Sequence, residues 1–306
     1  MRIVIGVDAS EPAEDACRFV ASRSWPVGTA IDIIATYDAT GLSGLAPASA
    51  MNLEAEREAL EGVIAGRATL LRSAGLNVTT VVEFGDPAQT IIGHAQDTYA
   101  QLIVVGSRRL GPIASAVLGS VSAHLVDHAP CPVLVVRSPG ATRMLLATDG
   151  SDSSRNIPHI LASWGDAFRG LPVEVLSVAH EAHPIDPFVP LTPRPARPIE
   201  PLQNHDYALH ERIAEQVADE MMELGWHSAA VATMGNPERE ILAAAASWRA
   251  DLIVTGSRGL GSLRRYVVGS LSHDLLMHSQ SSLLVVRGMV PAPIRKTAAV
   301  VSVAPA

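Results

Sequence analysis

A pattern of glycines and serines occurs twice in the chain, each time directly after a short apolar run. The first copy, VVGSRRLGPIASAVLGSVS, covers residues 104–122, and the second, VTGSRGLGSLRRYVVGSLS, covers residues 254–272. Gly106 and Gly119 correspond to Gly256 and Gly269 at a constant separation of 150 residues (256 − 106 and 269 − 119). Because glycine-rich segments that lead into a helix can present backbone N–H groups to anions, the pattern predicts two phosphate-binding loops.

Alternating strands and helices surround both loops. In the first half we expect strands at residues 3–7, 30–36, 78–83, 102–105 and 133–136, and helices at residues 11–24, 53–73, 87–98 and 120–128. In the second half we expect strands at residues 144–148, 173–178, 229–233, 252–255 and 283–286, and helices at residues 151–168, 202–224, 237–248 and 270–278. Continuous apolar strands that alternate with amphipathic helices predict a parallel sheet with helices on both faces.

The repeat predicts two tandem Rossmann-like α/β domains, each with a five-stranded parallel sheet. We place the first domain at residues 1–138, the second at residues 143–288 and a flexible tail at residues 289–306. The last strands, in CPVLVVR and SSLLVVR, are apolar, which permits them to pair across a pseudo-twofold axis. A loop follows the second strand of each domain, at 38–50 and at the proline-rich 180–201, and either loop can cover a ligand.

Candidate ligand-binding residues gather at one edge of each predicted sheet. In open parallel sheets, ligands bind beyond the carboxyl ends of the strands, where the strand order reverses. The candidates in the first half are Gly6, Asp8, Thr36, Gly106, Ser107, Arg108, Arg109, Gly111, Gly119, Ser120, Val121 and Ser122. The candidates in the second half are Ala147, Asp149, Val178, Gly256, Ser257, Arg258, Gly259, Gly261, Gly269, Ser270, Leu271 and Ser272.

A purely structural interpretation of these residues stays open. A serine after a glycine at the start of a helix is often only an N-cap, and glycines between a strand and a helix can serve tight turning alone. Asp8 and Asp149 can cap the helices that begin just after them. Arg108 and Arg258 can bind phosphate or be solvated.

Composition and motifs exclude several classes of protein. The net charge of −8 and the pI near 5.7 argue against nucleic acid or an anionic membrane as a partner. The chain has no apolar stretch long enough for a membrane span and enters a strand pattern at once, which favours a cytoplasmic protein. Cys17 and Cys131 are expected to be buried thiols rather than a disulfide or zinc ligands. His124 and His128 have a spacing that could hold a metal ion, but the second half does not repeat it, so no metal site is assigned.

The loop spacing resembles that of a known family. Gly, two residues, Gly, nine residues and Gly-Ser, with an Asp at the end of the first strand, is similar to the ATP-binding class of the universal stress protein family. Gly256, Gly259, Gly269 and Ser270 match this spacing in full. The resemblance covers about residues 1–287 as a tandem pair of the type common in actinobacteria, with an adenine nucleotide alpha hydrolase-like fold.

The resemblance implies roles for the candidate residues. Asp8 and Asp149 would contact the adenosine part of ATP, and the backbone of Thr36 and of Val178 would bind adenine. The loops that begin at Gly106 and Gly256 would hold the ribose and the phosphates, with Mg²⁺ on the phosphates. Ser120 and Ser270 would complete the phosphate site. The family further implies a regulatory role in stress response or growth arrest, and an internal pseudo-dimer in which the last strands of the two domains pair. We also expect a homodimer and regulatory protein partners of unknown identity.

Two other functions remain open. One is a slow ATP hydrolase or phosphotransferase, although no catalytic residue stands out, because the sequence offers no evident general base and no dedicated lysine near the γ-phosphate. The other is an interaction module with vestigial nucleotide pockets. The absence of GxSxG, P-loop and SGGxDS-like motifs argues against the corresponding hydrolase, P-loop and ATP-pyrophosphatase classes.

We predict that the first site binds nucleotide more weakly than the second. Arg109 stands where the family pattern has its second glycine, and a positive φ there would cost about 1–2 kcal/mol for a residue with a side chain. A remodelled loop, or a guanidinium that clamps a phosphate, would avoid this cost. Calorimetric titration of variants that keep only one intact site checks the prediction, and equal affinities would contradict it.

Overall fold

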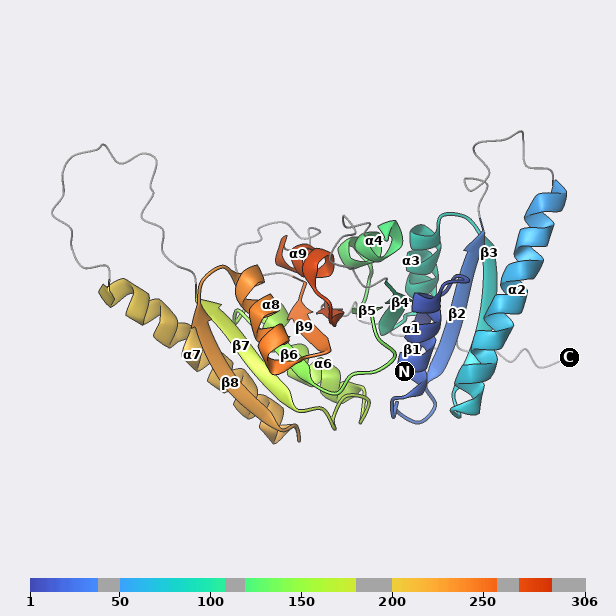
Figure 1. The fold of residues 1–306 in the computed structure, drawn as a ribbon. Helices are drawn as coiled ribbons and strands as arrows, with labels where there is room; N and C mark the ends of the chain where they lie inside the picture. Colours follow the sequence, from blue (N-terminus) through green and yellow to red (C-terminus); the bar gives the residue numbers. More distant parts are fainter. Residues whose placement is uncertain (38–49, 108–118, 180–199, 258–269, 288–306) are drawn as a thin grey trace, which may run out of the picture.

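The computed structural model describes residues 1–37, 50–107, 119–179, 200–257 and 270–287. The first half contains β1 (Arg2–Gly6), α1 (Glu11–Ala21), β2 (Ala30–Tyr37), α2 (Ala50–Ser73), β3 (Asn77–Phe84), α3 (Pro87–Asp97), β4 (Leu102–Gly106), α4 (Ser120–His128) and β5 (Val133–Val136). The second half contains β6 (Met144–Ala147), α5 (Asp152–Arg155), α6 (Ile157–Ser163), β7 (Val173–Ala179), α7 (Glu200–Glu223), β8 (Ser228–Met234), α8 (Pro237–Trp248), β9 (Leu252–Gly256), α9 (Ser270–His278) and β10 (Ser282–Val286). Figure 1 shows these elements along one sheet, with α2 beside one end and α7 beside the other.

The described strands form a single ten-stranded sheet with the order β3-β2-β1-β4-β5-β10-β9-β6-β7-β8. Neighbouring strands are parallel within each half. At the centre, β5 and β10 pair antiparallel, with Leu134 opposite Leu284. The expectation of two five-stranded parallel sheets joined as an internal pseudo-dimer is therefore confirmed.

Helices cover both faces of the sheet. Side chains on successive strand residues point to opposite faces, so each apolar strand contributes to two buried clusters. On one face, Ile5 of β1 belongs to the same buried cluster as Phe19 of α1, and this cluster extends to α2, α6 and α7. On the other face, Val4 belongs to a buried cluster with Ile91 of α3 and Leu125 of α4 that extends to α8 and α9. The core of each half is thus continuous with the core of the other half.

Aromatic side chains join the two halves on the face covered by α1 and α6. The ring centroids of Phe19 and Phe168 are 6.3 Å apart, and Trp25 meets Phe168 edge to face at 5.9 Å. The guanidinium of Arg23 lies over the Phe19 ring at 4.8 Å and donates from Nη2 to the carbonyl of Ala141 at 2.7 Å. The α1 region therefore packs directly on the second half.

Several predicted helix boundaries were wrong. The helix expected at residues 151–168 is broken into α5 and α6 at Asn156, and Pro158 explains the break because proline lacks an N–H and clashes with the preceding turn. The first helix ends at Ala21 with Ser22 as its C-cap, short of residue 24. Pro201, the last residue of the predicted loop at 180–201, lies in the first turn of α7, a position where proline is tolerated.

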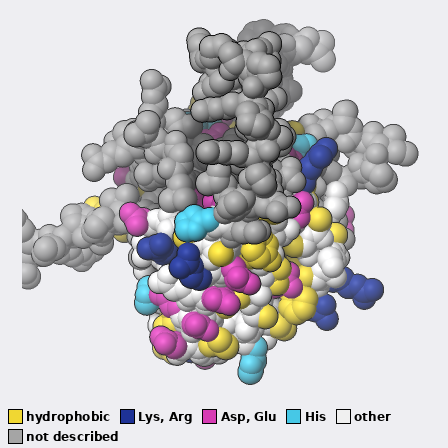
Figure 2. Space-filling view, turned by 90° about the vertical axis from the view of Figure 1, so that its left-hand side faces the viewer, with side chains coloured by type: hydrophobic (Ala, Val, Ile, Leu, Met, Phe, Trp, Pro, Cys, Tyr) yellow, Lys and Arg dark blue, Asp and Glu magenta, His cyan; other side chains and the backbone are white. Residues whose placement is uncertain are grey.

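The surface of the second half is mixed in character, and both cysteines are buried thiols as expected. Figure 2 shows acidic, basic and hydrophobic side chains interspersed on the end of the molecule formed by the second half. Among the described helices, none combines the length and apolar character that a membrane crossing needs. Cys17 and Cys131 are free and buried, and burial raises the pKa of each thiol to about 12.

The last residue of β4, Gly106, lies against the backbone of α1. A Cβ at Gly106 would stand 2.0 Å from the carbonyl oxygen of Pro12. At the corresponding position of the second half, a Cβ at Gly256 would have its nearest neighbour, the Oγ of Ser153, at 3.1 Å. The close approach of the helix start to the end of the strand therefore excludes a side chain more strictly in the first half.

We predict that Gly106→Ala lowers the free energy of unfolding by about 1–3 kcal/mol, because the added methyl group would overlap backbone atoms that cannot rotate away. Gly256→Ala is the matched control and should cost less. Chemical denaturation of both variants measures the difference. Equal losses for the two variants, or no loss for Gly106→Ala, would show that the contact of Gly106 with Pro12 does not exclude a side chain.

Candidate functional site

The candidate site of each half lies at the carboxyl edge of its strands, where the strand order reverses. β1 pairs with β2 on one side and with β4 on the other, all parallel. Asp8, Thr36 and Gly106 therefore follow or end neighbouring strands at the same edge. Asp149 and Gly256 take the same places around β6 and β9 in the second half. The predicted convergence of these segments holds in both halves.

Asp8 organises the turn between β1 and α1. Its Oδ1 accepts hydrogen bonds from the Ser10 backbone N–H at 2.9 Å and from the Ser10 hydroxyl. Ser10 is the N-cap of α1, with its Oγ accepting from the Ala13 N–H at 3.4 Å. Asp8 thus supports the cap rather than forming it, and the residue is exposed, so its carboxylate can also meet a ligand.

Asp149 has a more enclosed setting than Asp8. Its Oδ1 accepts from the Ser151 N–H at 3.0 Å and from the Ser154 hydroxyl at 2.9 Å. Ser151 and Ser154 are buried, and Asp149 itself is half-buried. The ends of β1 and β6 are therefore similar in backbone but different in side-chain chemistry.

The described loop glycines serve packing, not positive φ. Neither Gly106 nor Gly256 has a positive φ, and Gly119 has a φ of −60°. Gly6 is also a packing position, since a Cβ there would stand 2.5 Å from the side chain of Ile91. The interpretation of these glycines as tight structural contacts therefore accounts for them without a ligand.

The first amides of the two loops are already used inside the sheet. The Ser107 N–H donates to the carbonyl of Val136 at 2.8 Å, and the Ser257 N–H donates to the carbonyl of Val286 at 2.9 Å. Both bonds extend the pairing of the strand that enters the loop with the last strand of the same half. Any anion must therefore be bound by amides further along the chain.

Among the described residues, the start of α4 provides such amides. Its N-cap is Gly119, which makes no side-chain capping hydrogen bond. The Ala123 N–H donates to the carbonyl of Gly119 at 3.2 Å, so the amides of residues 120–122 precede this intrahelical bond and have no intrahelical acceptor. Ser120 is exposed. This end of the helix carries the positive pole of the macrodipole.

Ser122 and Ser272, two residues after the first residue of α4 and of α9, make hydrogen bonds within the protein. The buried Ser122 hydroxyl donates to the carbonyl of Gly119 at 3.0 Å, and the buried Ser272 hydroxyl donates to the carbonyl of Gly256 at 3.1 Å. The first bond lies within the first turn of α4, whereas the second joins the first turn of α9 to the end of β9. Val121 and Leu271 are half-buried against the face covered by α3 and α8, and Ala147 and Val178 are buried in the same core.

Part of each candidate site lies outside the described residues. These positions are Arg108, Arg109, Gly111, Arg258, Gly259, Gly261 and Gly269, together with the side chain of Ser270. The predicted covering loops and the tail also fall largely in this part of the chain. Their proposed roles stay predictions.

The structure adds polar residues that the sequence did not single out. In the second half, the Ser177 hydroxyl donates to the carbonyl of Thr148 at 2.8 Å, and the Nδ1 of the buried His210 lies 2.8 Å from the Oγ of Ser177. In the first half, Arg67 of α2 donates from Nη2 to the carbonyl of Ser10 at 2.8 Å. A lone histidine or arginine within a long helix has no local pattern that would mark it, because only the packing of α2 and α7 on the sheet brings it there.

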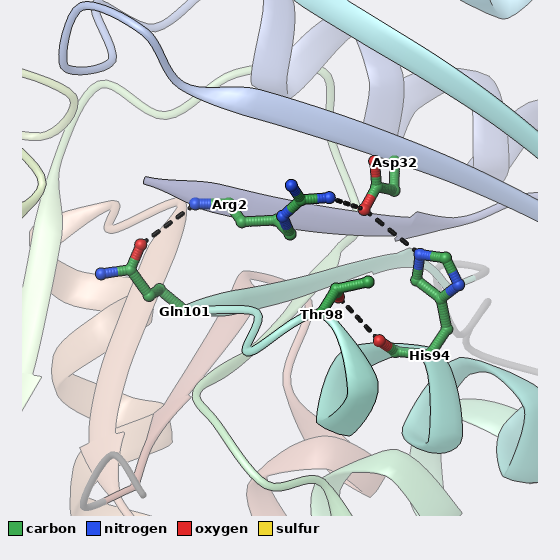
Figure 3. A network of polar contacts seen from close by, with 5 residues as sticks. All are labelled: Arg2, Asp32, His94, Thr98 and Gln101. Atoms are coloured by element: carbon green, nitrogen blue, oxygen red, sulfur yellow. Dashed lines mark hydrogen bonds and ion pairs between the residues drawn. The ribbon is translucent and has the colours of Figure 1, made fainter. Parts of the chain in front are cut away.

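A separate polar network lies toward the amino ends of the strands. The buried Asp32 of β2 pairs with Arg2 of β1 at 2.7 Å and with His94 of α3 at 3.2 Å, as Figure 3 shows. The carboxamide of Gln101 accepts from the Arg2 N–H at 3.0 Å. This network ties β1, β2 and α3 together at the end of the sheet opposite the candidate site, so we assign it to stability.

The histidines of α4 contact each other. The rings of His124 and His128 stack with centroids 4.3 Å apart, and the His124 Nε2 lies 2.8 Å from the Nε2 of Gln89. Within the described residues, no group of three or more His, Cys, Asp or Glu side chains is placed to hold a metal ion.

Comparison with known proteins gives the family. The model of the universal stress protein family matches residues 1–137 and again residues 140–287. A universal stress protein of Mycobacterium tuberculosis is 27% identical over 226 residues, which is 69% of this chain and 70% of that protein. A putative universal stress protein of Staphylococcus epidermidis is 33% identical over 138 residues, which is 44% of this chain and 83% of that protein.

A solved structure shows the same fold along nearly the whole chain. The crystal structure of a universal stress protein from Archaeoglobus fulgidus superimposes with a TM-score of 0.65 at 19% identity, covering 94% of this chain and 98% of that one. The fold, the repeat and the double family match lead to one conclusion. The chain belongs to the universal stress protein family and carries one family domain in each half.

Proposed function

We propose that the protein binds ATP, with Mg²⁺ on the phosphates, at the carboxyl edge of each half. In this proposal it acts in the cytoplasm as a regulatory protein of the stress response or of growth arrest. Family membership and the spacing around Gly256 and Ser270 support the assignment. Bound Mg²⁺ would neutralise phosphate charge, and we assign it no ligand from this chain.

The start of α4 is the observation that carries the proposal. It lies at the end of a glycine loop, beside the reversal of strand order, and its N-cap offers no side-chain acceptor to the first amides. Three backbone donors and the positive end of a helix dipole fit a polyphosphate. The exposed Asp8 at the neighbouring strand end fits a hydroxyl of the ribose, because a carboxylate accepts hydrogen bonds.

Binding fits the residues better than phosphoryl transfer does. Lys296, in the tail, is the only lysine in the sequence, so neither loop contains a lysine that could neutralise charge on a transferred phosphate. The side chains at the ends of β1 and β6 are engaged in hydrogen bonds of the turns. We therefore propose a regulatory role for the bound nucleotide rather than rapid turnover.

We predict that Ser120→Glu weakens ATP binding to the first half by at least about tenfold. The new carboxylate would occupy the positive end of α4 and repel the phosphates, while it would stabilise the helix by about 0.3–1 kcal/mol. ATP affinity should therefore fall while the midpoint of thermal unfolding stays level or rises. Calorimetric titration and thermal unfolding of the same samples measure both quantities.

Two controls make this test specific. Thr69→Glu adds the same charge at an exposed position of α2, away from the site, and should leave ATP binding unchanged. Ser120→Gln adds similar bulk without charge and should cost less affinity than Ser120→Glu. Unaltered ATP affinity in Ser120→Glu, or no ATP binding by the wild type, would contradict the proposed function.

A further inference from the structure

Arg137, the residue that follows β5, reaches across to the second half. Its guanidinium donates to the backbone carbonyls of Leu276 and Ser279 at the C-terminal end of α9. Its own backbone N–H donates to the hydroxyl of Ser282 at 3.1 Å. Arg137 is 4% exposed, so a charged side chain from one half is buried against a helix of the other.

Arg287, the residue that follows β10, makes the reciprocal contacts. Its guanidinium donates to the carbonyl of Ala129 at 3.2 Å and to the carbonyl of Val126, both at the C-terminal end of α4. The donors and the acceptors are separated by the same interval as the two glycine loops. The halves therefore exchange arginines across the pseudo-twofold axis.

The exchanged contacts have a clear physical basis. The last carbonyls of a helix have no intrahelical partner and carry the negative end of the macrodipole, so a guanidinium both satisfies and neutralises them. Burial lowers the pKa of Arg137 to about 10, which leaves the side chain charged at neutral pH. The antiparallel pairing of β5 and β10 brings each strand end beside the helix end of the other half.

Each arginine also lies next to a candidate loop of its own half. The carbonyl of Val136, directly before Arg137, accepts the amide of Ser107, where the first loop begins. The carbonyl of Val286, directly before Arg287, accepts the amide of Ser257, where the second loop begins. A continuous path of bonds therefore runs from each loop, through an arginine, to the C-terminal end of the helix whose first turn belongs to the other site.

We propose that Arg137 and Arg287 are positioning residues that align the phosphate-binding helix of the opposite half and so couple the two nucleotide sites. This inference rests on the proposed function. α4 and α9 span nine residues each, so each is roughly 13 Å long. Because such a short helix moves as a unit, fixing its C-terminal end also sets the direction and position of the amides in its first turn.

The test measures each site separately. Ser270→Glu is used to weaken ATP binding to the second half and Ser120→Glu to weaken it in the first, so that the tighter site measured in each background is the unaltered one. In the Ser270→Glu background, Arg287→Ala should weaken ATP binding to the first half by about fivefold or more, although Arg287 belongs to the second half. In the Ser120→Glu background, the same change should alter the affinity less than twofold, and Arg137→Ala should give the mirror-image pattern.

Arg287→Lys provides the rescue, because a lysine keeps the charge at the end of α4. It should restore most of the affinity that Arg287→Ala loses. Equal weakening of both sites, weakening of the second site alone, or a lower thermal midpoint with both affinities unchanged would overturn the inference.

A readout without ligand separates this inference from the proposed function. If the wild type binds no ATP, the proposed function fails, while the positioning role is still measurable in the backbone amide resonances of residues 120–122. Arg287→Ala should shift these resonances at the far end of α4, and Arg287→Lys should leave them near their wild-type positions. Unshifted resonances in Arg287→Ala would overturn the positioning role.

Discussion

The antiparallel pairing of β5 with β10 is the interaction on which the rest of the structure depends. It turns two parallel sheets into one and makes the hydrophobic cores of the halves continuous on both faces. It also places the end of each last strand beside the end of a helix from the other half, where the arginines bind. Without this pairing, each half would expose an apolar edge strand and leave the last carbonyls of α4 or α9 without a charged partner.

The repeat preserves backbone geometry while the side chains around the two sites have diverged. The first half has Pro12 packed on Gly106, with Arg67 bound to the carbonyl of Ser10. The second half has a set of buried hydroxyls around Asp149, with His210 beside Ser177. Two sites that share a strand order and a helix start can thus differ in affinity and in response, because different side chains surround the ends of β1 and β6.

Hydrophobic periodicity was sufficient to predict the fold. Runs such as LIVV and SSLLVVR indicated buried parallel strands. The apolar last strands only permitted the pairing of the two halves, and the family resemblance was needed to expect it. Periodicity alone did not predict the break at Asn156, although Pro158 is a local signal for it. It could not predict the exchange of Arg137 and Arg287, since both arginines contact residues far away in the sequence. It also did not separate the packing role of Gly106 from a ligand-binding role, because both require the same missing side chain.

The central claim is that the first turns of α4 and α9 hold a polyphosphate with backbone amides. Its most direct test is the change in the amide resonances of residues 120–122 and 270–272 when ATP or adenosine is added to the isotopically labelled protein. The account predicts large shifts of these amides with ATP and small ones with adenosine, which lacks the phosphates. Binding of ATP that leaves the amides of both helix starts unmoved would contradict it.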